Sequence, residues 1–358
     1  GGFSQVASVT GVFVLLRAGW GIDGAFAGQA AVAWFTVLAY LVPLSAVIFA
    51  RGKITSVRRG EMRKLMVGAW LTNVSNTALG KQMDIMVMTA FAVGSAAIGY
   101  YNLAYQLGSI IGVVLISGLG GVGMAAMSAA LSTGGPKRLI SMWRASIMLQ
   151  VILAVPLQTV CFVFADQIVT VLYGSNYAGA VLLLRVFLAF TMFGRLIGGG
   201  ASQGALYVIG KQRSVVVLRW SGLIINVILD VTLIQVYGPI GAMIATGFSQ
   251  VWVGLMEYLL LRLHLGTEYP IAFAGRVTGV AAFAALLVLW WAPGGLIGLI
   301  AEFSLFGALF AFGLWITNSE GTNDLTELML ANPRLKAIFT RVGRLMPRIK
   351  PATVTAST

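Results

Sequence analysis

The chain has 358 residues, of which 58% are apolar, with a mean hydropathy of +0.90 and a formal net charge of +13. This composition excludes an ordinary soluble globular protein. Its single cysteine, Cys161, and single histidine, His264, exclude a disulfide framework and argue against a Cys/His metal site. We therefore expect structural roles for both residues, no cofactor, no metal and no catalytic residues.

Long apolar runs account for most of the chain, and most of them exceed the roughly 20 residues that a helix needs to cross about 30 Å of hydrocarbon. The runs lie at 3–19, 27–49, 66–92, 97–124, 140–164, 179–205, 214–236, 239–261, 277–293 and 295–317. The pattern predicts an all-α polytopic membrane protein with about ten transmembrane helices.

Lysine and arginine cluster in every second connection between these runs. The basic connections lie at 51–64, 137–144, 211–213, 262–276 and 334–350. The alternate connections, at 20–26, 93–96, 165–178, 237–238 and around 294, contain no basic residue. Because basic residues favour the cytoplasmic side, we expect these loops and the C-terminus inside. Positive charge beside membrane spans favours anionic lipid head groups as partners rather than nucleic acid.

A short internal repeat indicates how the spans are grouped. Gly21-Ile22-Asp23-Gly24-Ala25 begins the second run, and Gly238-Pro239-Ile240-Gly241-Ala242 begins the eighth. Parallel repeats are a common way to build transporters. If spans three to eight form one six-helix unit, the first two spans end an earlier copy, and four upstream spans are expected.

This grouping predicts five segments along the chain. They are the last two helices of an N-terminal lobe, a basic cytoplasmic linker, a six-helix C-terminal lobe, two additional helices, and a basic amphipathic tail. Their bounds are 1–50, 51–65, 66–264, 265–317 and 318–358. We expect the linker and the tail to lie on anionic lipid at the cytoplasmic leaflet.

The third run carries a polar stripe, because its polar residues are three or four positions apart and share one helix face. They are Asn73, Asn76, Thr77, Gly80, Lys81 and Asp84. Charged groups are costly in a bilayer, so this face must meet a protein interior or a water-filled cavity. One interpretation is a buried Lys81–Asp84 ion pair that only fixes packing. The other is a cavity face that contacts substrate or a coupling ion.

Later runs add further candidates for the same cavity. Asn102 and Gln106 share one face of the fourth run. Arg195 lies nearest mid-membrane in the sixth run and has no acidic neighbour on its own helix. It therefore needs Asp84, Asp230 or an anionic substrate group as its partner.

Secondary candidates are Arg185, Arg219 and Asp230. Arg185 and Arg219 lie nearer the ends of their spans, where their side chains can instead extend to lipid head groups. Glu257, close to the inner end of the eighth run, is expected to be a surface residue.

Several motifs resemble those of bacterial polysaccharide exporters, the O-antigen and exopolysaccharide flippases of the multidrug/oligosaccharidyl-lipid/polysaccharide exporter superfamily. Asp84 is followed by Gly99-Tyr100-Tyr101 and Ala104-Tyr105-Gln106-Leu107, as at the junction of that family's seventh and eighth helices. Further matching stretches are Val171–Ala180, Gly204–Leu206 with Gly210–Arg213, and Gly238–Ala242. The resemblance extends over most of 1–317.

The resemblance implies a MATE-like bundle of two lobes that face a central cavity, here lacking the first four helices. It also implies a flippase in the bacterial cytoplasmic (inner) membrane. This flippase passes lipid-linked oligosaccharide or polysaccharide precursors, on undecaprenyl pyrophosphate, to the outer leaflet by alternating access. On this view Lys81 and Arg195 meet the phosphate charge, and Asn73, Asn76, Asn102 and Gln106 meet the hydroxyl groups. A polysaccharide polymerase and glycosyltransferases are the expected protein partners.

Two other functions remain open. An ion-coupled multidrug or other lipid exporter of the same superfamily would have an acidic, aromatic cavity for cations. A membrane glycosyltransferase or polymerase would need a larger extramembrane region or a carboxylate cluster.

Overall fold

The computed structural model describes residues 80–114, 119–290 and 295–317 continuously, together with scattered residues between 24 and 75. The chain divides into two compact units, Gly1–Arg63 and Lys64–Thr358. In the first unit the described residues, between 24 and 63, are helical. The predicted linker 51–65, apart from Arg63, and the predicted tail 318–358 lie outside the described residues.

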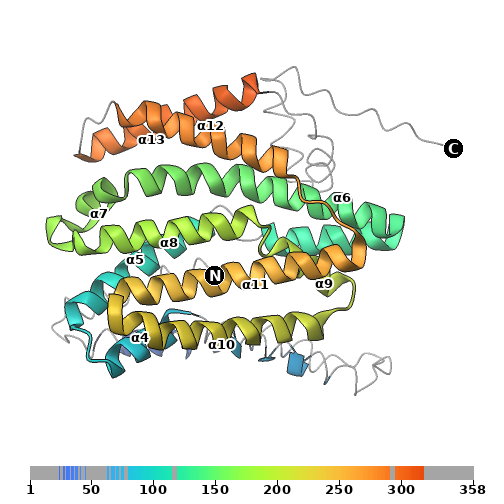
Figure 1. Cartoon of the computed structure of the whole chain (residues 1–358), viewed down its shortest axis with the longest axis horizontal. Coiled ribbons are helices and arrows are strands. Elements are labelled where there is room, and N and C mark those ends of the chain that lie inside the picture. Colours follow the sequence, from blue (N-terminus) through green and yellow to red (C-terminus); the bar gives the residue numbers. More distant parts are fainter. Residues whose placement is uncertain are drawn as a thin grey trace. The chain divides into compact units, whose positions relative to one another are not determined.

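The second unit is built from helices throughout its described ranges (Figure 1). In chain order they are α4 (Lys81–Ala90), α5 (Ser95–Val114), α6 (Leu119–Val163), α7 (Ala165–Tyr173), η1 (Ser175–Tyr177), α8 (Gly179–Leu196), α9 (Ala201–Val208), α10 (Gln212–Tyr237), α11 (Pro239–Leu265), α12 (Ile271–Leu289) and α13 (Gly295–Ile316). Within these ranges, six helices are long and apolar enough to cross a membrane.

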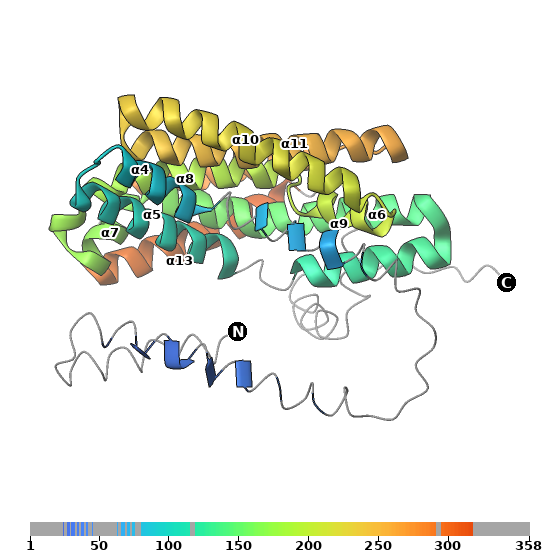
Figure 2. The same ribbon diagram turned by 90° about the horizontal axis from the view of Figure 1, so that it is seen from below.

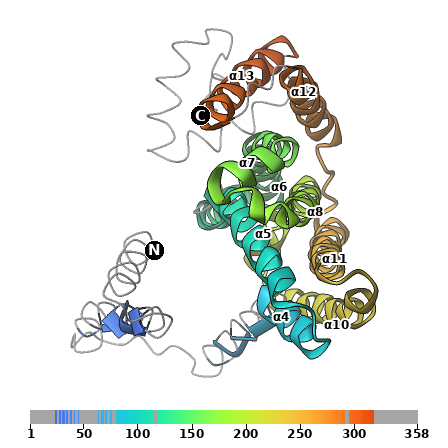
Figure 3. The same cartoon turned by 90° about the vertical axis from the view of Figure 1, so that its left-hand side faces the viewer.

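The helices pack around α8, which contacts α5, α6 and α11. Figure 3 views the bundle nearly end-on, with α10 and α11 paired at one edge and α12 and α13 at another. Trp143 is a large buried side chain of the core. Its ring stacks on that of Tyr258 with the ring centroids 6.0 Å apart, and its Nε1 donates a hydrogen bond to Ser202 Oγ at 3.3 Å. The two additional helices attach mainly through α12, which packs on α6, and α13 also contacts α7.

Helix α6 corrects the expected connection at 137–144, which is helical. The chain turns instead at Gly135, whose φ of 68° is the left-handed conformation that glycine tolerates. Pro136 then opens the second arm, where its missing N–H leaves no helical bond unmade. Figure 2 shows the two arms of α6 one above the other. The basic residues therefore lie on a helix that extends beyond the apolar run.

The expected single span 179–205 is also interrupted. Helix α8 ends at Leu196 and α9 begins at Ala201, with Gly198 and Gly200 at φ values of 85° and 89°. The runs at 214–236, 239–261 and 295–317 do match helices α10, α11 and α13, and the run at 277–293 matches all but the start of α12. A hydropathy pattern does not show a break of three or four residues when those residues are glycines inside an apolar run.

Candidate substrate and ion sites

A helix break borders a cavity in the second unit with a volume of about 290 Å³. Gly80, which is extended (φ −98°, ψ 178°) immediately before α4, contributes to its wall. Gly194, Gly199 and Gly200, at the break between α8 and α9, contribute as well. Irregular backbone at membrane depth is tolerated where it faces a protein-lined or water-filled space. We call this space the arginine cavity, because Arg195 and Arg219 are its two cations.

Arg195 extends from the last turn of α8 into the wall of this cavity. Among the residues that the structure describes, none accepts a hydrogen bond from its guanidinium group or forms an ion pair with it. Neither Asp84 nor Asp230 is its partner, which removes two of the three partners expected from the sequence. The remaining expectation is an anionic group of the substrate.

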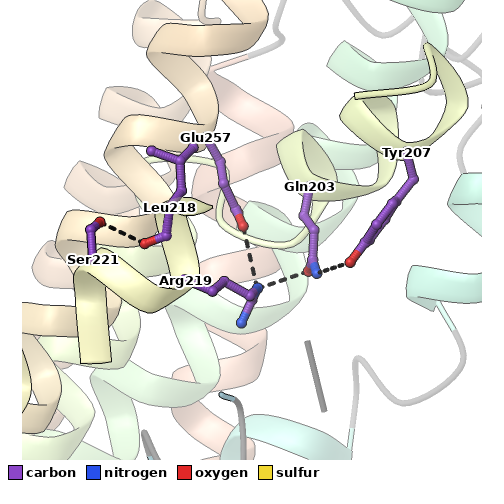
Figure 4. Close-up of polar contacts among 6 residues, drawn as sticks. All are labelled: Gln203, Tyr207, Leu218, Arg219, Ser221 and Glu257. Carbon is purple, nitrogen blue, oxygen red and sulfur yellow. Dashed lines mark hydrogen bonds and ion pairs between the residues drawn. The ribbon is translucent and has the colours of Figure 1, made fainter. Parts of the chain in front are cut away.

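Arg219, on α10, is held from two sides (Figure 4). Its Nη2 donates to Gln203 Oε1 of α9 at 2.9 Å and lies 3.4 Å from Glu257 Oε1 of α11. Glu257 is 1% exposed, so the expectation of a surface residue was wrong. The alternative interpretation of Arg219, an extension to lipid head groups, does not fit either. Both residues lie near the end of a span, where a charged side chain is usually expected to be exposed. Here helices α9, α10 and α11 contact one another and enclose both side chains.

A second site, which we call the carboxyl cluster, joins four helices, and none of its residues lines the arginine cavity. It comprises Asp84 of α4, Tyr101 of α5, Asn226 and Asp230 of α10, and Thr246 of α11, all at most 2% exposed. Tyr101 donates to Asp84 Oδ2, as does Thr246 Oγ1 at 2.6 Å. Asn226 Nδ2 donates to Thr246 Oγ1 at 3.2 Å. The carboxyl groups of Asp84 and Asp230 lie near one another in this cluster.

This cluster can hold a proton or a small hard cation. Two carboxylates cannot both stay charged in contact without a cation between them. Within the described ranges neither carboxylate forms an ion pair, and no donor satisfies either oxygen of Asp230. Oxygen ligands of this kind suit hard cations. A larger set of acidic, cysteine and histidine ligands for a metal ion is absent from the described part of the chain.

The sequence-predicted residues fall into separate places. Lys81 Nζ donates to Asn102 Oδ1 at 2.9 Å, and it forms no ion pair with Asp84, which was one of the two interpretations of the polar stripe. Gln106 is exposed and joins neither site. Arg185 donates to the carbonyl oxygens of Phe162 and Val163 at 3.3 and 3.5 Å. Asn73, Asn76 and Thr77 lie outside the described residues.

Sequence reasoning missed several members of both sites. Asn226 and Thr246 are neutral polar residues in apolar runs, and Asn226 precedes Asp230 by one helical turn. That spacing was a usable signal for a shared face. Gln203 gave no comparable signal, because its role depends on the break between α8 and α9.

Comparison with known proteins identifies the family. The family described as polysaccharide biosynthesis protein matches residues 3–182, which is half of the chain. The match includes Asp84 and Tyr101 of the carboxyl cluster, whereas Arg195, Arg219 and Glu257 lie beyond it. No curated protein matches the chain.

Two solved structures are similar to this chain. The lipid II flippase MurJ, in an inward closed conformation, superposes with a TM-score of 0.69 at 14% identity, over 88% of this chain and 65% of MurJ. The chain thus spans slightly less than two thirds of the length of that protein. A multidrug resistance MATE family transporter of the MOP superfamily, in an outward-facing conformation, gives a TM-score of 0.47 at 16% identity over 78% of this chain and 68% of its own. The chain therefore belongs to the polysaccharide biosynthesis protein family, and the fold of the described part is similar to that of a lipid II flippase.

Proposed function

We propose that this protein flips lipid-linked oligosaccharide or polysaccharide precursors from the cytoplasmic to the outer leaflet of the bacterial cytoplasmic membrane. The carrier would be undecaprenyl pyrophosphate, whose tail remains in the bilayer while the head group passes through the protein. Family and fold are those of a multi-pass membrane transporter. The substrate, its direction of movement and the cytoplasmic C-terminus are parts of the proposal.

The observation that supports this substrate is Arg195 in the arginine cavity. A partly buried guanidinium group with no partner among the described residues favours an anionic ligand, because an unpaired charge in a low-dielectric site is costly. Phosphate groups suit arginine, whose planar donors can bond two oxygens at once. The glycines of the wall leave backbone close to any group bound there.

The carboxyl cluster supplies a way to drive the movement. A proton or a monovalent cation at Asp84 and Asp230 would bind together with its ligands from α4, α5, α10 and α11. Occupancy would change how tightly these four helices hold together. In this superfamily fold such a change would bias a rocking motion between inward-open and outward-open states.

The two rival functions fit less well. A multidrug exporter for cations requires an acidic cavity, whereas two arginines and one glutamate line this one. A glycosyltransferase or polymerase would use carboxylates at a place accessible to substrate, whereas both carboxylates of the cluster are fully buried. Such enzymes remain proposed partners, as do anionic lipids at 51–65 and 318–358.

Reconstituted transport tests the proposal. The full-length protein in liposomes should carry a fluorescent undecaprenyl-pyrophosphate oligosaccharide to the opposite leaflet, measured by its exposure to a membrane-impermeant quencher. A cationic dye and undecaprenol without phosphate serve as control cargoes, and neither should move. Transport of the dye with no transport of the lipid-linked saccharide would replace this proposal with the multidrug function.

A further inference from the structure

The contact between Glu257 and Arg219 is unusually loose for a pair so well enclosed. Glu257 is 1% exposed, yet its Oε1 lies 3.4 Å from Arg219 Nη2 and accepts no hydrogen bond among the described residues. Charge-assisted N–H···O bonds are normally about 2.7–2.9 Å long. The carboxylate therefore holds the guanidinium by charge, while its Oε1 accepts no hydrogen bond from the described residues.

Gln203 holds the same guanidinium group more closely, and it does so without charge. Its Oε1 accepts from Arg219 Nη2 at 2.9 Å, and its Nε2 is oriented toward Tyr207 OH at 3.4 Å (Figure 4). Because the amide carries no charge, an arriving anion does not repel it. Gln203 can therefore remain bonded to Arg219 while the carboxylate partner is exchanged.

The surroundings allow such an exchange, since all three charged groups line the same space. Arg195, Arg219 and Glu257 border the arginine cavity together. An anion that bonds Arg195 would approach Arg219 from the cavity and compete with the Glu257 carboxylate for the same donor. An arginine presents five N–H donors, so a phosphate can replace one acceptor while another stays bound.

We propose that Glu257 is a resident counter-ion that the phosphate of the substrate head group displaces from Arg219 and that returns when the substrate leaves. Glu257 is thus a positioning residue: it acts on the substrate through Arg219. Its displaced Oε1 would accept a hydroxyl group of the attached saccharide, which avoids leaving a buried carboxylate without a partner. This inference rests on the proposed function for the identity of the ligand.

The direction in which Glu257→Gln changes the Kd for pyrophosphate tests the displacement. Inorganic pyrophosphate would be titrated into the purified full-length protein by calorimetry, for the wild type and for Glu257→Gln. Since the competitor is removed, Glu257→Gln should lower the Kd by at least about fivefold, a coupling of the size found between interacting charged groups. Glu268→Gln, at an exposed position between α11 and α12, is the matched control and should leave the Kd unchanged. An unchanged or raised Kd in Glu257→Gln would overturn the inference.

A double-mutant cycle separates displacement from simple repulsion by a negative charge. In an Arg219→Gln background, Glu257→Gln should change the Kd by less than about twofold if Glu257 acts through Arg219. A fivefold gain that persists without Arg219 would mean that Glu257 acts on Arg195 through its field alone, which contradicts the exchange. The Arg219→Gln, Glu257→Gln pair is neutral, so this comparison remains available if Glu257→Gln alone does not fold.

Transport distinguishes this inference from the proposed function. If Glu257 assists release, Glu257→Gln should bind pyrophosphate more tightly and yet flip the lipid-linked saccharide more slowly, at wild-type abundance. Tighter pyrophosphate binding in a protein that does not flip this lipid would leave the exchange intact and overturn the proposed substrate. Wild-type flipping rates with an unchanged Kd would leave the proposed function intact and overturn the exchange.

Discussion

At the scale of single residues, this bundle holds two buried acids in one place and two arginines in another. The carboxyl cluster contains the acids Asp84 and Asp230, both fully buried. The arginine cavity contains two cations, with a single carboxylate set against one of them. Each charge in a membrane interior needs a partner. The groups whose partners are incomplete, Arg195 and Asp230, are therefore where ligands are expected.

Arg195→Ala should abolish most transport while the protein still folds. Removing a charge-assisted hydrogen bond costs about 1.5–3 kcal/mol, so we expect transport to fall roughly tenfold or more. Surface polysaccharide and membrane abundance would be measured together in cells. Arg213→Ala, at an exposed position near the start of α10, is the control and should retain both. Loss of Arg195→Ala from the membrane would instead indicate a purely structural residue.

Asp230→Asn should uncouple transport from its driving ion. The amide of asparagine can donate to Asp84, so the pair of facing side chains no longer requires a proton or cation between them. Coupling free energies of about 1–3 kcal/mol correspond to roughly 5–150-fold effects. We therefore expect an imposed proton or sodium gradient to accelerate flipping in liposomes of the wild type and not in the variant. Asp166→Asn, exposed at the start of α7, should respond to the gradient like the wild type.

At the scale of helices, glycine residues determine where helices end and where two helices can approach closely. The α10–α11 hairpin turns at Gly238, and Pro239 starts the next helix. A Cβ at Gly241 would lie 2.3 Å from the carbonyl oxygen of Leu233, which belongs to the backbone and cannot move aside. The close packing of α10 against the start of α11 therefore requires a residue without a Cβ at position 241.

Gly241→Ala should therefore destabilise the bundle more than an ordinary glycine substitution. Overpacking in a closed interior costs about 1–3 kcal/mol, and a backbone clash belongs at the upper end of that range. Thermal unfolding of the detergent-solubilised protein would measure the loss. Gly279→Ala in α12 has no atom within 4 Å of the new Cβ and should unfold at the wild-type temperature or slightly above it. Equal behaviour of the two variants would contradict the close approach.

At the scale of the whole molecule, orientation in the membrane follows from the basic connections. Ser175 precedes α8 and Gln212 follows α9, so the chain crosses from one end of the bundle to the other between them. The basic residues at 211–213 predict that the second end is cytoplasmic. The native Cys161 is buried and 3% exposed, so labelling of introduced cysteines should have little background.

Cysteine labelling tests this orientation. Ser175→Cys should react with an impermeant maleimide added outside intact spheroplasts, and Gln212→Cys should react only after the membrane is opened. Mass spectrometry of the labelled protein would measure both, with the native cysteine as the reference. Reaction of both positions from one side would exclude the predicted topology.

Residues in helices were easier to predict than residues in sites. The apolar runs predicted α10, α11 and α13 closely, because each helix must satisfy its own backbone in a membrane. The sequence also indicated that Asp84 and Arg195 are interior charges, because a charged side chain is too costly to face lipid. The partners of the interior charges were not predicted. Lys81 bonds Asn102, and Asp84 lies with Tyr101, Thr246 and Asp230.

The sequence by itself determined the class of the protein, the spans that correspond to α10, α11 and α13, an expected orientation and a family resemblance. These depend on hydropathy, on the distribution of basic residues and on short motifs, all of which are local along the chain. Only the tertiary structure decided that Glu257 lies buried beside Arg219 and that two acids from α4 and α10 face one another. Those contacts join residues far apart in the sequence, and they depend on helix breaks and packing angles that hydropathy does not encode.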